Sequence, residues 1–366
     1  MPKVWQAIVG SAQELTLEER TIDLEDLRDE EVYVETEVTA LSTGTELGNY
    51  LGDSQYIPGA PGYPRALGYC NVGTVRQVGS AVTDFKPGDR VFSTKRHQSA
   101  YIARASDLLL LVPQGVSAEE ASLAFFAHLG LSSLHWAGYE AGENIVVIGL
   151  GVIGLCTVAV ARAMGANAIA VANSEVRASV ALRIGADVTV LADDPALLDQ
   201  VAAAFPGAGA DIVVLTANTW EAYRLAMRVV RHSGRVCILG FPGRGQPAPT
   251  FNPLDPSWVW AKRLSLLGCG FDTHVEAPAS DLRFNTRRNL RYLLDLMALG
   301  RLRLEPIISH RFPYYRMQEA YELAANHSKE LVAAVFDWRC QTERADSTVV
   351  VGQDSYDLRT ADLRHA

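Results

Sequence analysis

The sequence has no closely spaced cysteines and no long uninterrupted apolar run. Its five cysteines are far apart and form no C-x-x-C pair: Cys70, Cys156, Cys237, Cys269 and Cys340. This argues against a disulfide framework and a structural zinc lobe, and free thiols suit a reducing compartment. The apolar stretch 145–160 is broken by three glycines, and the acidic N-terminal region lacks the pattern of a signal peptide. We therefore expect a cytoplasmic protein without a membrane span.

Positive charge is also scarce. Lysine and arginine number 33 against 42 aspartates and glutamates, which gives a formal net charge of −9. This balance argues against nucleic acid or an anionic membrane as the main partner, and we expect a small-molecule substrate instead. At 366 residues, with 48% apolar and 20% charged residues, the chain is long enough for two globular domains.

What the chain does have is a glycine turn between a strand and a helix. The apolar run 145–148 leads into G-x-G-x-x-G, and a helical pattern follows at once. The first glycine permits the tight turn, the second lets the backbone approach a pyrophosphate, and the third lets helix and strand pack closely. The phosphates would bind N–H groups at the positive end of the helix. These residues are the predicted cofactor turn: Gly149, Leu150, Gly151, Val152, Ile153 and Gly154.

The sequence pattern changes character near Pro113. From 31 to 111, short alternating runs broken by turn residues predict an all-β, barrel-like region. Ser117 and Glu120 then form a capping box at a helix start. Beyond it, strands alternate with helices, which predicts an α/β fold with a parallel, doubly wound sheet. The strands are expected at 145–148, 168–172, 211–215, 235–239 and 264–267, with later strands at 306–310 and 331–336 and a further possible strand at 349–351.

On these features the chain resembles the medium-chain dehydrogenase/reductase superfamily over roughly residues 4 to 338. Segment 42–46, S-T-G-T-E, is similar to the C-G-T-D segment of that family, and 67–73 stands where the family has G-H-E before a strand. Segment 78–91 matches its V-G-x-x-V-x-x-F-K-x-G-D-R-V stretch. The resemblance implies a GroES-like β-barrel catalytic domain (1–120 and 305–340), a Rossmann NAD(P)-binding domain (121–304) and a C-terminal extension (341–366).

The resemblance also implies that the catalytic zinc site of the family is missing. Zinc members bind the ion through Cys, His or Glu side chains at three positions. Here those positions hold Thr43, Tyr69 (followed by Cys70) and Ala124. We therefore expect no metal. A rearranged site using Cys70, His97 or His128 is the alternative.

Three residues are the candidate catalytic group implied by the resemblance. Thr45 stands at the position of the family's proton-relay hydroxyl and is expected to hydrogen-bond the reacting oxygen; the alternative is a turn threonine. In relatives, the position that corresponds to His128 lies beside the nicotinamide ring. The imidazole of His128 could exchange a proton there near neutral pH; the alternative is a buried core histidine. Glu46 completes the group, with orientation of its loop or pairing with an arginine as the favoured role.

Other polar residues near these motifs carry weaker interpretations. Tyr50, Tyr56 and Tyr69 are candidates for lining the substrate cleft, with core packing as the equal alternative. His97 is interpreted as a surface or interdomain histidine.

The second cofactor segment follows the strand 168–172. An NAD-preferring site usually has an Asp or Glu there, but this chain has Asn173 and Ser174. Ser174 and Arg177 can hydrogen-bond a 2′-phosphate, which favours NADP(H). NAD(H) is the alternative, with Glu175 holding the ribose. Further contacts are expected at the ends of later strands, from Thr216, Gly240 and Gly270, and pairing of the edge strand 264–267 predicts a homodimer.

The predicted function is that of a zinc-independent, NADP(H)-dependent oxidoreductase. It would interconvert a ketone and a secondary alcohol on a sugar, cyclitol or secondary metabolite. The first alternative is reduction of an activated C=C bond, as in quinone and enoyl reductases of the family, which also lack zinc. The second is a cofactor-binding protein without catalysis, like the lens crystallins of this family.

Overall fold

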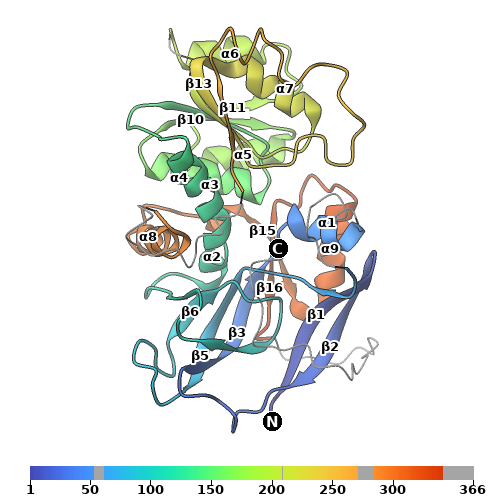
Figure 1. Cartoon of the computed structure of the whole chain (residues 1–366), viewed down its shortest axis with the longest axis vertical. Helices are drawn as coiled ribbons and strands as arrows, with labels where there is room; N and C mark the ends of the chain where they lie inside the picture. The colour runs from blue at the N-terminus through green and yellow to red at the C-terminus, as the bar shows by residue number, and fades with distance from the viewer. Residues whose placement is uncertain (53–61, 208, 271–283, 341–366) are drawn as a thin grey trace. The chain divides into compact units, whose positions relative to one another are not determined.

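The computed structural model describes residues 1–52, 62–207, 209–270 and 284–340. The chain divides into two compact units (Figure 1). The first consists of Met1–Ala124 and the chain from Ile308 onward, and the second of Phe125–Ile307. Among the helices in the described ranges, none combines the length and hydropathy needed to cross a membrane.

The first unit is built mainly of β-strands. Its large sheet has the order β15-β16-β3-β5-β6-β8, with β7 also paired to β3, and a smaller sheet has the order β2-β1-β4. Within the large sheet β16 lies between β15 and β3, so a strand from the end of the chain continues the sheet begun near its start. The elements are β1 Lys3–Ser11, β2 Glu14–Thr21, β3 Glu31–Ala40, α1 Thr45–Leu51, β4 Arg65–Ala66, β5 Asn71–Val78, β6 Arg90–Ser93, β7 Ala100–Arg104, β8 Leu109–Leu111, α2 Ala118–Ser122, β15 Ile308–Pro313, η4 Tyr314–Arg316, α9 Met317–Ala325 and β16 Ala333–Asp337.

The second unit contains the parallel sheet that the sequence predicts. All neighbouring strands run parallel in the order β11-β10-β9-β12-β13-β14. Counted within the unit this is 3-2-1-4-5-6, the Rossmann order, whose reversal beside β9 marks where a dinucleotide binds. The elements are α3 Ala124–Trp136, β9 Asn144–Ile148, α4 Val152–Ala163, β10 Asn167–Ala172, α5 Glu175–Arg183, β11 Val188–Leu191, α6 Leu197–Ala204, β12 Ala210–Leu215, α7 Trp220–Val229, β13 Val230–Ile238, β14 Ser265–Gly268, α8 Thr286–Ala298 and η3 Glu305–Ile307.

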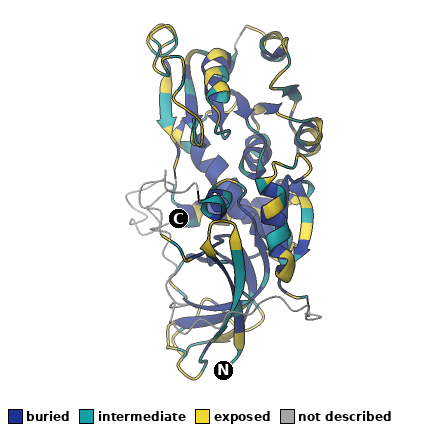
Figure 2. Cartoon of the chain, turned by 90° about the vertical axis from the view of Figure 1, so that its right-hand side faces the viewer, coloured by how far each residue is buried: buried dark blue, intermediate teal, exposed yellow. Residues whose placement is uncertain are grey.

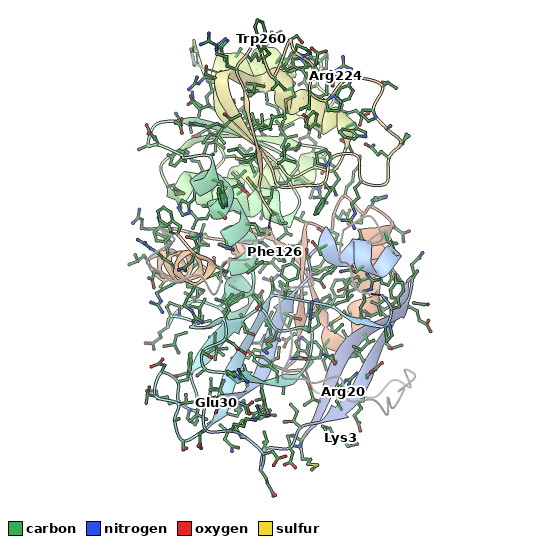
Figure 3. All side chains as sticks on the ribbon, viewed as in Figure 1. Lys3, Arg20, Glu30, Phe126, Arg224 and Trp260 are labelled. Atoms are coloured by element: carbon green, nitrogen blue, oxygen red, sulfur yellow. The ribbon has the colours of Figure 1, made fainter. Side chains whose placement is uncertain are left out.

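The strands carry apolar side chains, which favours sheets whose faces are packed against helices or other strands. The central strand β9 is buried along its whole length, as expected for a parallel strand with helices on both faces. Figure 2 shows the same burial in the strands of both units, with exposed residues on the outer helices and turns. The exposed Trp260 lies in the connection between β13 and β14 (Figure 3), where 81% of its surface is accessible.

The structure confirms the α/β fold class and corrects some local expectations. The cap at Ser117 is confirmed, because its hydroxyl accepts the Glu120 N–H at 3.1 Å. The segment expected to be entirely β contains the short helix α1. Strands β1, β2 and β11 and helix α6 were not expected. The possible strand at 349–351 lies outside the described residues.

Candidate active site

The glycine turn joins β9 to α4 through two positions that admit no side chain. Gly149 has φ +95°, and a Cβ on it would lie 2.7 Å from the backbone nitrogen of Ala217. A Cβ on Gly154 would lie 1.9 Å from the carbonyl oxygen of Gly149. Gly151 caps α4 without a side-chain hydrogen bond. The N–H groups of the first turn, which begins with Val152 and Ile153, are therefore available to an anion.

The ends of the next strands meet this turn. The Thr216 hydroxyl, just after β12, donates to the carbonyl oxygen of Gly149 at 2.6 Å. A Cβ on Gly240, just after β13, would lie 2.7 Å from the carbonyl oxygen of Thr216. Both residues thus lie beside the turn, and Thr216 also holds its shape. Gly270, after β14, has open space where a Cβ would stand. It is the last described residue before Phe271, which lies outside the described ranges.

The end of β10 brings an arginine over the turn. Ser174 caps α5 by accepting the Arg177 N–H at 3.5 Å. The Arg177 guanidinium donates to the carbonyl oxygen of Leu150 at 2.8 Å, and it lies 4.0 Å from where a Cβ of Gly151 would stand. Asn173 is exposed. A positive charge is therefore fixed between the phosphate turn and the end of β10, where no carboxylate precedes the cap.

In the first unit the candidate Glu46 is a buried, fully hydrogen-bonded carboxylate. It is 1% exposed and lies on α1. One oxygen accepts the Tyr321 hydroxyl at 2.7 Å and lies 2.8 Å from His97 Nε2, and the other accepts the Ser42 N–H at 2.9 Å. Burial lowers the pKa of Arg96, and the nearby charge of Glu46 partly restores it. Glu46 thus orients its own loop, with an arginine near it.

The interpretation of His97 as a surface residue was wrong. His97 is 0% exposed, and both ring nitrogens are engaged, Nε2 with Glu46 and Nδ1 with the Thr39 hydroxyl at 2.7 Å. Thr39 Oγ1 accepts the Trp338 indole N–H at 2.9 Å. Since the indole only donates, Thr39 can give its hydrogen to Nδ1, and His97 then donates from Nε2 to Glu46. With these hydrogen positions Trp338, Thr39, His97 and Glu46 form one continuous hydrogen-bonded series.

Thr45, the first candidate catalytic residue, is connected to a second polar group. The Tyr69 hydroxyl lies 2.6 Å from Ser42 Oγ, and the Thr45 side chain is within hydrogen-bonding reach of it. Burial, followed by the proximity of Cys70 and Glu46, raises the pKa of Tyr69 well above its ordinary value. Tyr69 is 2% exposed, whereas Thr45 is only half-buried. Thr45 therefore offers the accessible end of a short line of hydroxyl groups.

His128, on α3 of the second unit, has a different environment from the one expected. It is 1% exposed, its ring centroid lies 5.4 Å from that of Phe125, and Nδ1 has no hydrogen-bond partner among the described residues. Burial, together with the charge of His135, lowers the pKa of His128 to about 4. With this pKa the imidazole is neutral at neutral pH, which favours the buried core histidine over the proton exchange expected there. It keeps its hydrogen-bonding capacity.

Models of known protein families match an N-terminal and a central segment of this chain. The model of the alcohol dehydrogenase GroES-like domain matches residues 28–123, and that of the zinc-binding dehydrogenase matches residues 152–284. The sorbitol dehydrogenase of Bacillus subtilis (strain 168) is 25% identical over 362 residues, covering 88% of this chain and 94% of that protein. The NADP-dependent isopropanol dehydrogenase of Thermoanaerobacter brockii is 26% identical, covering 74% and 83%.

The fold agrees with a solved structure as well. Galactitol-1-phosphate dehydrogenase from Escherichia coli superposes with a TM-score of 0.74 at 18% identity, over 91% of this chain and 99% of that one. The chain belongs to the zinc-type alcohol dehydrogenase-like division of the medium-chain dehydrogenase/reductase superfamily. It is an oxidoreductase that uses a nicotinamide cofactor.

The residues at the zinc positions of this family do not fit the ion. Thr43 is half-buried, Tyr69 already hydrogen-bonds Ser42, and Ala124 has no donor atom. Zinc sites in proteins need thiolate, imidazole or carboxylate ligands. Among the residues that the structure describes, no three His, Cys, Asp or Glu side chains are grouped so that they could hold a metal ion. In the proposed rearranged site, His97 has no ring nitrogen left for a ligand bond.

Sequence reasoning did not identify most of the cluster around Glu46. Ser42 was noted only as part of a family motif, Tyr69 was considered as a cleft-lining or packing residue, and Thr39, Tyr321 and Trp338 were not singled out. The local sequence signal for this cluster was the tyrosine at position 69, which stands where the family has a zinc ligand. Tyr50 is buried and accepts a hydrogen bond from Gln318 at 2.9 Å, which makes it a packing residue. Tyr56 lies outside the described residues.

Proposed function

We propose that this protein interconverts a ketone and a secondary alcohol with NADP(H), without zinc. The proposed substrate is a sugar, a cyclitol or a secondary metabolite. The observation that carries the proposal is the half-buried Thr45 hydroxyl, backed by Tyr69, in a site whose zinc positions hold no zinc ligands. Two relatives named above, the sorbitol and isopropanol dehydrogenases, are named for alcohols with a secondary hydroxyl group.

The roles of the residues follow from their positions. A nicotinamide cofactor, when bound, would supply a hydride to a ketone or accept one from an alcohol. Thr45 donates its hydrogen to the ketone oxygen as negative charge develops there, and the proton needed for the alcohol comes from solvent through this hydroxyl. Glu46 holds the start of α1 through Ser42 and does not touch the substrate. His128, neutral and buried, is proposed as a hydrogen-bonding group near the nicotinamide rather than as an acid or base.

The proposed preference for NADP(H) rests on Arg177. Its guanidinium is held over the glycine turn by the Leu150 carbonyl, and the preceding strand ends without a carboxylate that would repel a 2′-phosphate. Arg177→Gln should lower kcat/KM with NADPH by about 10–100-fold, the value of one charge-assisted hydrogen bond, and leave NADH nearly unaffected. Arg183→Gln, an exposed arginine on the same helix, is the matched control. Equal losses with both cofactors would reject this preference.

The reaction type is tested with parallel panels of ketones and enones. Turnover of secondary alcohols and ketones, reduced about 100-fold by Thr45→Val and little by Thr45→Ser, would support the proposal. Reduction of enones with no activity on ketones would support the C=C reductase instead. Cofactor binding without any turnover would support a non-catalytic protein.

We also propose a homodimer formed along β14. This strand is the edge of the parallel sheet, and its outer residues Ser265 and Gly268 are exposed. An unpaired edge offers hydrogen-bonding groups to a second copy of the chain. Light scattering after size exclusion should give twice the chain mass, and Leu266→Pro should reduce it to one. A monomeric wild type would refute the dimer.

A further inference from the structure

Tyr69 occupies a place that neither the family motif nor core packing explains. It stands at one of the three zinc-ligand positions, yet it is a phenol buried to 2% exposure. A buried hydroxyl needs hydrogen-bond partners: Tyr69 lies 2.6 Å from Ser42 Oγ, and the Thr45 side chain is within its hydrogen-bonding reach. Three hydroxyl groups therefore run from the half-buried Thr45 inward to Ser42, which is 0% exposed.

The inner end of this line is held rigidly. The Ser42 N–H donates to the Glu46 carboxylate at 2.9 Å, and the Glu46 N–H donates back to the Ser42 carbonyl oxygen at 3.2 Å. Among the described residues the Ser42 hydroxyl makes no other hydrogen bond than the one with Tyr69. Ser42 thus holds the Tyr69 hydroxyl in a fixed position. Rotation about its Cβ–Oγ bond lets the Ser42 hydroxyl either donate a hydrogen bond to Tyr69 or accept one from it.

Each hydroxyl can donate one hydrogen bond and accept others, so the line can point in two directions. If Ser42 donates to Tyr69 and Tyr69 to Thr45, the Thr45 hydrogen is directed outward, toward a ketone oxygen. If Thr45 donates to Tyr69 and Tyr69 to Ser42, the Thr45 oxygen can accept a hydrogen from an alcohol. Rotation of three O–H bonds therefore matches the site to either form of the substrate.

We propose that Tyr69 is the positioning residue of the reaction: anchored on Ser42, it sets the direction of the Thr45 hydroxyl where other members of the family use a metal ion. The inference rests on the proposed function, because it assigns Thr45 to the substrate oxygen. It adds a residue buried behind the accessible surface that acts on the substrate only through Thr45.

The test is a double-mutant cycle on the rate of hydride transfer in a single turnover with NADPH and a ketone that the wild type reduces. Tyr69→Phe should lower this rate about 10-fold, as expected for one lost neutral hydrogen bond, with unchanged NADPH affinity. In the Thr45→Val background, Tyr69→Phe should have no further effect, because the hydroxyl that it positions is gone. Multiplicative effects of the two substitutions would overturn the proposal.

A matched control separates positioning from stability. Tyr101 is another fully buried tyrosine of the same unit, and its hydroxyl accepts the Ser93 hydroxyl at 2.8 Å. Tyr101→Phe should cost similar stability but leave the rate unchanged; an equal loss of rate in both variants would reject a specific role for Tyr69. If Tyr69→Phe does not fold, Ser42→Ala in the same cycle decides, since it removes the anchor without changing the aromatic core.

The outcomes also separate the two proposals. A wild type that reduces no ketone refutes the proposed function. A wild type that reduces ketones as fast as Tyr69→Phe refutes the role of Tyr69 and leaves the function standing.

Discussion

Replacing Glu46 by glutamine changes one atom type in a buried cluster and tests how that cluster is held. The carboxylate accepts hydrogens on both oxygens, from Tyr321, from Ser42 and, with the hydrogen positions given above, from His97. An amide has one accepting oxygen, and its nitrogen only donates. If the amide oxygen stays with His97 and Tyr321, the NH₂ group meets the Ser42 N–H, and two donors face each other.

The flipped amide does not relieve the conflict. Its oxygen then accepts the Ser42 N–H, but its NH₂ group faces His97, whose ring must move its proton to Nδ1. Thr39 Oγ1 would then accept from both His97 and Trp338, and its own hydrogen would lose its present acceptor. The first orientation leaves one buried donor without a partner, and the flipped one leaves two, the hydroxyls of Thr39 and Tyr321.

The expected loss follows from these contacts. An unsatisfied buried donor costs about 1–3 kcal/mol, and three hydrogen bonds lose a charged acceptor worth about 1 kcal/mol each. Part of this is returned because no charge is buried any longer. We therefore expect Glu46→Gln to reduce the free energy of unfolding by about 2–4 kcal/mol. For a unit of this size, that lowers the melting temperature by about 6–12 °C.

Near-ultraviolet circular dichroism is a suitable assay for the first unit. Trp338 is stacked on Tyr314 there, with ring centroids 4.8 Å apart and planes at 11°. The control is Glu35→Gln, whose ion pair with Arg76 has side chains 48% and 54% exposed and should change stability by less than about 0.5 kcal/mol. If Glu46→Gln melts at the same temperature as Glu35→Gln, the reasoning about the cluster fails.

Three further predictions concern the second unit. The pKa of His128 is about 4 in the folded protein, below its value in the unfolded chain, so folding favours the neutral imidazole. This contribution to the free energy of unfolding is complete above about pH 6.5, and up to about 3 kcal/mol of it is lost as the pH falls toward 4. Melting temperatures measured from pH 7 to 4 should therefore fall less steeply in His128→Leu than in the wild type, and parallel curves would contradict this. Gly154→Ala places a Cβ 1.9 Å from the Gly149 carbonyl oxygen, so NADPH affinity measured by fluorescence should fall more than 10-fold, whereas Gly165→Ala, with open space around it, should leave it unchanged. Lys262 Nζ donates to three carbonyl oxygens at the junction of α7 and β13, and Lys262→Met should cost about 1–2 kcal/mol in denaturant unfolding, against no measurable cost for the exposed Lys86→Met.

The cofactor turn and the parallel sheet were predictable because their signals are local. Close backbone contacts around the turn leave no room for a side chain at Gly149 and Gly154. The strand, the turn and the start of the helix are recognisable in the ten consecutive residues 145–154. The alternation of strands and helices then predicted a parallel, doubly wound sheet, whereas the order of its strands comes from the structure. Helix α1 was not predictable in the same way. It has only seven residues, includes Gly48, and is too short to show a helical period.

The cluster around Glu46 was not predictable because its members are far apart in sequence. The hydrogen bond from Tyr321 spans 275 residues, and that from Trp338 to Thr39 spans 299. His97 follows Lys95 and Arg96, a polar setting that suggested the surface, yet Lys95 is itself only 6% exposed. His128 was correctly considered as a possible buried histidine, but only the packing around it determined that its pKa falls to about 4.

The position of β16 between β15 and β3 has a consequence for how the protein is made. During synthesis, the residues of the second unit leave the ribosome as one continuous stretch and can fold as soon as Ile307 has emerged. The first unit must wait for Tyr321, β16 and Trp338, since until then Glu46 lacks one of its donors and residues 38–40 of β3 are paired on one side only. The nascent N-terminal part therefore carries an incomplete sheet until residue 338 has been made, which makes this stage the one at which a chaperone would be most useful.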